Sequence, residues 1–183
     1  MWRKYTKKEK KANTRDNLTD VYSHDYSSSI PPNQAVELGT INYINLTPDQ
    51  KHGDINKALS MAKQTGKPLF CNFVEWSGWR GCKEAGKTIF ADPAIKRAAE
   101  ELFVPCAFNT WDRHDPRRND AMKRWGAGLD DSWWGYLRIV DSEGRNVVTK
   151  TGQITGGHKL LEVKQVLRDA LFQMNNSVPA YLY

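Results

Sequence analysis

The hydrophobic pattern changes from irregular to periodic at about residue 41. Apolar residues recur at helical spacing in residues 54–66, where Asp54 is a suitable N-cap and Gly66 a suitable C-terminal residue. An apolar run, PLFCNFV, follows at 68–74 and is typical of a strand buried on both faces. The segment INYINL at 41–46 alternates enough to predict a short strand before this helix.

The middle of the chain continues the alternation of helices and strands. A helix is predicted from about residue 80 to 90, and Asp92 followed by Pro93 is a strong start signal for the next one. LFVPCAFN at 102–109 predicts a strand, in which Pro105 removes one ladder donor and indicates a poorly paired side.

The last third predicts a short helix, a hairpin and a long helix. The short helix covers about 118–125, the hairpin joins YLRIV to RNVVTK through the turn DSEG, and the final helix covers about 158–174. With the two successive helices between residues 80 and 102 counted as one helical segment, the element order is β-α-β-α-β-α-β-β-α. It predicts an α/β domain with parallel crossovers first and an antiparallel hairpin last.

The chain divides by composition into an arm, a domain and a tail. Residues 1–38 are polar without a sustained period and predict an extended N-terminal arm, 39–176 form the domain, and 177–183 are a short tail. Residues 1–11 hold six basic side chains against one acidic, so they account for most of the net charge of +6. Such an arm could contact an acidic surface, but a solvated tail is the favoured interpretation.

Several functional classes receive no support from the sequence. The three cysteines have no CxxC spacing and the four histidines are scattered, so we expect neither a metal site nor a cofactor. No apolar run approaches the roughly 20 residues that span a bilayer. The start of the chain lacks the apolar core of a signal peptide, which predicts a cytoplasmic protein, or an exported one if a leader has been removed.

Three stretches resemble the thioredoxin-like family, over residues 41–174. AKQTGKPLFCNFVEW resembles the family's helix, Gly-Lys-Pro, strand and Trp entry; TIFADPAIKRAAEELFVPCAFN resembles the continuation after its redox motif; and LRIVDSEGRNVV resembles its final hairpin. The resemblance implies a thioredoxin-like fold: a central mixed sheet with a C-terminal antiparallel hairpin, flanked by helices and preceded here by the arm.

The redox motif of that family is incomplete in this chain. The family has Trp-Cys-x-x-Cys-Lys on the first turn of a helix, whereas WRGCK places Trp79 at the position of the attacking cysteine and Cys82 at that of the resolving one. The family's cis-proline corresponds to Gly135. The resemblance therefore implies a domain without ordinary dithiol exchange.

Cys82 has two interpretations. A helix N-terminus beside Arg80 and Lys83 would favour a thiolate, so a single thiol could form mixed disulfides or react with peroxide. Alternatively, Cys82, Ala85 and Ile89 share one face of the helix and form a core stripe, which we favour. Cys71 and Cys106 lie in neighbouring predicted strands and are expected to be reduced core thiols, with a disulfide as the alternative.

Five of the seven tryptophans map to the ends of strands that converge on one edge of the sheet: Trp76, Trp79, Trp111, Trp133 and Trp134. The polar residues Glu75, Arg80 and Asp112 are interleaved with them. This Trp-rich rim fits a binding site for a protein or peptide, with nucleic acid a minority interpretation, and it fits equally a cap on the core. His114 could act as a general acid or base, although a charged surface loop is the favoured interpretation.

Three functions remain open at this point. The leading hypothesis is a binding or accessory module that uses the Trp-rich rim. The second is a monothiol oxidoreductase or peroxide-reactive protein that uses Cys82, with Arg80 stabilising the thiolate. The third is a structural subunit of a larger assembly.

Overall fold

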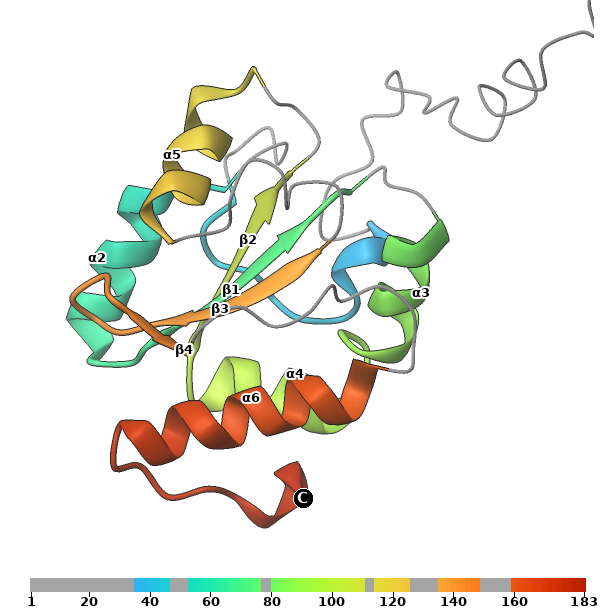
Figure 1. The fold of residues 1–183 in the computed structure, drawn as a ribbon, viewed down its shortest axis with the longest axis vertical. Helices are drawn as coiled ribbons and strands as arrows, with labels where there is room; N and C mark the ends of the chain where they lie inside the picture. The colour runs from blue at the N-terminus through green and yellow to red at the C-terminus, as the bar shows by residue number, and fades with distance from the viewer. Residues whose placement is uncertain (1–34, 47–52, 77–79, 111–113, 126–134, 149–158) are drawn as a thin grey trace, which may run out of the picture.

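The structure is a computed structural model, and it describes residues 35–46, 53–76, 80–110, 114–125, 135–148 and 159–183. At its centre lies a four-stranded mixed sheet (Figure 1). Its strands are β1 (Leu69–Val74), β2 (Val104–Asn109), β3 (Tyr136–Val140) and β4 (Asn146–Val148), in the spatial order β2-β1-β3-β4. β1 pairs parallel with β2 and antiparallel with β3, and β3 pairs antiparallel with β4. The expected mixed sheet with a C-terminal hairpin is confirmed.

Most helices begin where the sequence signals place them. The helices are α2 (Ile55–Thr65), α3 (Arg80–Thr88), α4 (Pro93–Glu101), α5 (Pro116–Arg124) and α6 (Leu160–Gln173), with 3₁₀ turns η2 (Val36–Leu38) and η5 (Ala180–Leu182). Of these, α5 begins at Pro116, two residues earlier than expected, with Asp115 as its N-cap. Asp92 accepts hydrogen bonds from the N–H groups of Ala94 and Ile95 at 2.9 and 3.0 Å. Asp54 caps α2 in the same way through Lys57, and Gly66 ends that helix in the left-handed conformation. These caps satisfy N–H groups that a helix cannot pair internally.

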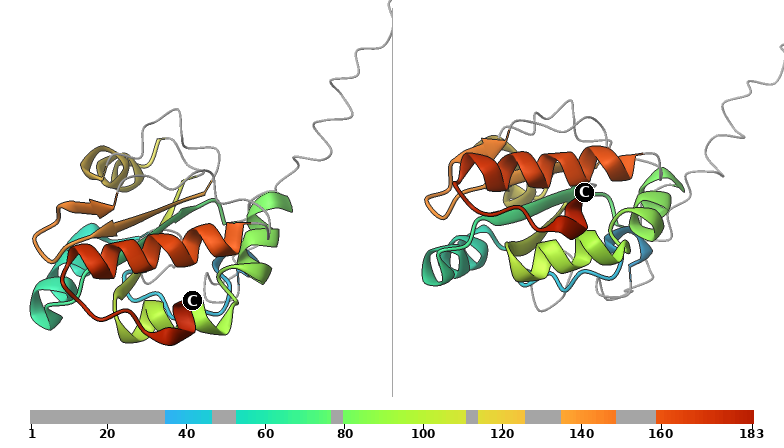
Figure 2. Two further views of the ribbon diagram at one scale, coloured as in Figure 1. Left: turned by 60° about the horizontal axis from the view of Figure 1, so that its bottom comes forward. Right: turned by 90° about the horizontal axis from the view of Figure 1, so that it is seen from below.

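Helices cover both faces of the sheet. One face carries Phe70 and Ile139 and packs against α3, α4 and α6, while the other carries Cys71 and Phe73 and packs against α2 and α5. Figure 2 shows α4 and α6 together on their side of the sheet. Because β1 is covered on both sides, all six of its residues are buried, as its apolar run predicts.

Residues 41–46 do not form the expected strand. Instead, Ile44 donates a backbone hydrogen bond to the oxygen of Pro105 (3.0 Å) at the outer edge of β2. The side chain of Asn45 accepts from the N–H of Ala107 (2.9 Å) and donates to its oxygen (3.1 Å). A side-chain amide thus replaces the backbone groups of a fifth strand, and the prediction of a strand was wrong for this reason. β2 lies at the edge of the sheet, as Pro105 indicated.

Both ends of the described chain pack onto the domain. η2, which falls in the last residues of the expected arm, packs against α3, and Leu38 within it is buried. η5, which falls in the expected tail, packs against α4 and α6 through the buried Leu182. None of the described helices is long and apolar enough to cross a bilayer.

Candidate functional site

The registers of the sheet bring three chain segments to one edge. β1 and β2 run parallel and end together, with Val74 opposite Asn109, and β3 begins beside the end of β1, with Tyr136 opposite Phe73. Glu75, Thr110 and Gly135 therefore lie at the same carboxyl edge of the sheet. The N–H of Thr110 also donates to the oxygen of Val74 (3.2 Å), which ties the two strand ends together. This convergence is the one that the order of the strands predicts.

The structure describes some of the residues expected at this edge. Glu75 is 3% exposed, Trp76 is 5% exposed, Gly135 is buried and Arg80 is exposed at the start of α3. The other expected residues lie outside the described part of the chain: Trp79, Trp111, Asp112, Trp133 and Trp134.

Cys82 lies in the core, with no exposed surface. It belongs to a cluster with Trp76, Leu38 and Val74, together with Ala35 and Ala107. Ala85 and Ile89, the other two members of its helical stripe, are also fully buried. Trp76 is therefore part of the same buried cluster as the thiol and presents almost no exposed surface.

A segment that precedes the sheet covers this cluster. We call residues 35–46 the N-terminal strap. A Cβ atom placed on Gly86 in α3 would meet the main-chain oxygen of Val36, so η2 packs on the backbone of the helix that carries Cys82. The strap then turns at Gly39, which has a φ of 66°, and Thr40 donates to the oxygen of Phe90 (3.1 Å). Sequence reasoning missed this covering role because residues 35–40 have no regular period and the alternation at 41–46 predicted a strand instead.

The remaining two thiols belong to register partners on neighbouring strands. Cys71 in β1 is the register partner of Cys106 in β2, and both are free and buried. Burial raises the pKa of Cys71 well above its ordinary value, and Cys106 raises it further. Arg138 on β3, the other strand beside β1, lowers this pKa. Burial also raises the pKa of Cys106 strongly. Both thiols are therefore protonated at neutral pH, as expected for reduced core cysteines.

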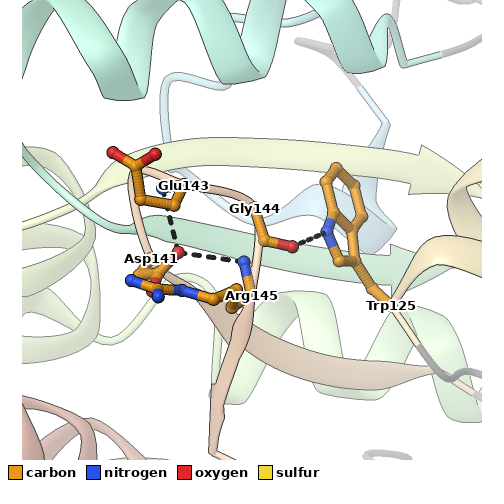
Figure 3. A network of polar contacts seen from close by, with 5 residues as sticks. All are labelled: Trp125, Asp141, Glu143, Gly144 and Arg145. Carbon is orange, nitrogen blue, oxygen red and sulfur yellow. Dashed lines mark hydrogen bonds and ion pairs between the residues drawn. The ribbon is translucent and has the colours of Figure 1, made fainter.

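Arg138 is a buried cation that the sequence analysis did not single out. It lies opposite Cys71 in the sheet register, and its Nε donates to the oxygen of Trp125 (3.1 Å). Trp125 in turn packs against Phe73 and Phe108, and its Nε1 donates to the oxygen of Gly144 (3.2 Å; Figure 3). The available signal was a single charge within the apolar run YLRIV, because a buried charge needs dedicated partners.

A second polar group follows β2. Arg118 in α5 donates from Nε to the oxygen of Thr110 (3.2 Å) and from Nη1 to Asn119 (2.7 Å). Asp115 is buried and caps α5 by accepting from the N–H of Arg117 (2.8 Å). The hydroxyl of Thr110 is buried and has no hydrogen-bond partner among the described residues. Asp115 thus has a structural role, and His114 beside it is exposed.

The described residues contain no group of three histidine, cysteine, aspartate or glutamate side chains placed to hold a metal ion. No protein-family model matches the chain, and no curated protein matches it. A solved structure of a DsbH oxidoreductase is similar to it, with 21% sequence identity and a TM-score of 0.44, over 69% of this chain and 87% of that chain.

Proposed function

We propose that this chain is a thioredoxin-like domain without dithiol chemistry, which binds a protein or an extended peptide at the carboxyl edge of its sheet. The observation that carries the proposal is the burial of Cys82. A nucleophilic thiol must be reachable and must ionise. Cys82 instead has no exposed surface and belongs to a buried cluster that includes Leu38 of the strap and Trp76.

The rim tryptophans support binding at this edge through their places in the sequence. Trp111 directly follows Thr110, and Trp134 directly precedes Gly135, two residues that lie at the edge. Tryptophan is a preferred anchor in protein interfaces because it presents a large rigid apolar surface with one donor.

Capture of a partner by tagged protein tests the proposal. Replacing Trp79 and Trp133 by alanine should reduce the recovered partner by about tenfold, while the thermal unfolding midpoint changes little. Phe172→Ala on α6 is the matched control, because Phe172 is 78% exposed and lies on a different element. Equal recovery by the double variant and the control would exclude the rim as the binding site.

The competing function is thiol–disulfide exchange through Cys82. It requires that the strap leave α3, because only then could a substrate sulfur reach the thiol. A Cys82→Ser variant that kept full activity in a thiol-exchange assay would exclude this function.

A further inference from the structure

The outer face of α3 is a stripe of positive charge. Arg80, Lys83 and Lys87 are all exposed and recur at spacings of three and four residues, while Cys82 and Ala85 are buried on the opposite face. Side chains at these spacings are neighbours on a helix surface. We call these three residues the α3 basic stripe.

The α3 basic stripe is not neutralised within the described part of the chain. None of its three side chains makes a hydrogen bond or an ion pair with another described residue. Elsewhere on the surface, basic side chains do pair within their helix, as in Arg97 with Glu101 (3.0 Å) and Arg124 with Asp120 (3.0 Å). Glu84 is the one acidic residue of α3, so this helix carries three basic side chains and one acidic side chain.

Two of the three stripe residues work against the stability of their own helix, whereas Lys87 lies in the last turn, where the dipole favours a cation. Arg80 and Lys83 occupy the first turn, where the helix dipole is positive and favours acidic side chains, and α3 has no acidic residue there. Like charges three and four residues apart also repel one another. Helix stability therefore does not explain the placement of Arg80 and Lys83, whereas an external group of opposite charge would offset both costs.

The surroundings of the stripe favour a protein over a nucleic acid. η2 lies beside α3 (Figure 1), with the main chain of Val36 against Gly86. Val36 is 44% exposed, which adds an apolar position next to the stripe. An apolar position beside basic side chains suits a protein segment that carries both carboxylates and an apolar side chain.

We propose that the α3 basic stripe docks an acidic segment of the protein partner. This inference rests on the proposed binding function and names the chemistry of the partner: carboxylate side chains along α3, with an apolar side chain against Val36. Such charge complementarity selects the partner and its orientation at the neighbouring edge of the sheet.

The test uses the full chain and a labelled poly-glutamate peptide that carries a photo-crosslinker. The variant replaces Arg80, Lys83 and Lys87 by glutamine. The matched control replaces Lys57, Lys63 and Lys67, on and just after α2, by glutamine, so the net charge changes equally. We expect the α3 variant to weaken binding by about tenfold in fluorescence anisotropy at low salt and the α2 control by less than about twofold. Crosslinks should map to residues 80–88.

Three results would overturn the inference. The first is an equal loss of peptide affinity in both variants, and the second is crosslinks that map away from α3. The third is that single-stranded DNA binds wild type more tightly than the peptide does and loses affinity in the α3 variant. The basic arm contributes equally to all three proteins, so it does not affect the comparison. We expect poly-glutamate, which has no apolar side chain for the rim to hold, to bind the Trp79 and Trp133 variant as it binds wild type. Failure here therefore leaves the Trp79 and Trp133 test unchanged, and failure of that test leaves this result unchanged.

Discussion

The main-chain oxygen of Val36 lies 1.8 Å from the position that a Cβ atom on Gly86 would take. Because only glycine lacks this atom, η2 can lie on α3 only with glycine at this position. The consequence reaches Cys82, which shares α3 with Gly86 and belongs to the same buried cluster as Leu38 of η2. One glycine therefore controls how closely the strap covers the thiol.

Gly86→Ala should displace η2 and expose Cys82. We expect alkylation of Cys82 in the folded protein to accelerate by about tenfold or more, and the free energy of unfolding to fall by about 1–3 kcal/mol, because the added methyl group overpacks the contact. Site-resolved mass spectrometry after a pulse of iodoacetamide measures the first quantity, and urea unfolding measures the second.

Gly66→Ala is the control for global destabilisation. Gly66 has a φ of 68°, and a methyl group added to it would meet nothing within 4 Å, so alanine there is strained without a clash. It should lower stability without exposing Cys82 selectively. If both variants expose the thiol to the same extent, the strap is not what protects it.

Native alkylation of the wild type distinguishes the two functions considered for Cys82. All three thiols should react slowly at pH 7, because all are buried. Raising the pH to about 9 should not accelerate Cys71 or Cys106, since burial holds the pKa of both well above that range. Rapid reaction of Cys82 alone at neutral pH would make the monothiol function the better account.

The elements that the sequence predicts well are those with local signals. Asp92 with Pro93, and Asp54 with Gly66, define helix ends through contacts within a few residues, so the pattern alone locates α4 and α2. The strand prediction for residues 41–46 was wrong because the partner of this segment is distant: Asn45 forms hydrogen bonds with Ala107, 62 residues away. Alternation cannot show whether the backbone or a side chain makes such bonds.

In the candidate site, too, the features with local signals could be predicted and those set by distant contacts could not. The burial of Cys82 follows from its helical stripe with Ala85 and Ile89, and the edge formed by Glu75 and Gly135 follows from the order of the strands. The position of the covering strap could not be predicted, because Val36 and Gly86 are far apart in the sequence and no local pattern marks their contact. Arg138 could have been found only by asking what pairs a charge inside an apolar strand.

Asn45→Ala should be costly because it leaves two backbone groups of β2 unpaired. Both the N–H and the oxygen of Ala107 bond to this side chain in a buried position. We expect the free energy of unfolding to fall by about 2 kcal/mol or more, measured by urea unfolding. Asn42→Ala is the control, since Asn42 bonds to Glu100 at an exposed site and should cost about 0.5 kcal/mol. Equal losses would show that water replaces the bonds to Ala107.

The hairpin between β3 and β4 should make stability depend on pH through Asp141. Its Oδ1 accepts from the N–H groups of Glu143 and Arg145, both at 2.9 Å, and its Oδ2 pairs with Nε of Arg145 at 2.8 Å (Figure 3). Partial burial alone would raise the pKa of Asp141, but these hydrogen bonds and the charge of Arg145 outweigh it and lower the pKa below its usual value.

A lowered pKa in the folded state means that the folded protein binds this proton less readily than the unfolded chain. The stabilisation is therefore fully present above the unfolded value of about 3.9 and is lost as the pH falls through the folded value. Asp141→Asn should lower the free energy of unfolding by about 1 kcal/mol at pH 7, and the difference from wild type should shrink below about pH 4.

Urea midpoints measured from about pH 7 down to about pH 2.5 would show this convergence. Glu143→Gln removes the same charge from the same turn, and the hydrogen bond from Glu143 to Asp141 uses its backbone N–H, so this control should follow wild type at every pH. A constant difference between Asp141→Asn and wild type over the whole range would mean that the loss comes from geometry and that the carboxylate charge contributes nothing. Convergence specific to Asp141 would assign the acid sensitivity of the hairpin to its contacts with Arg145 and Glu143.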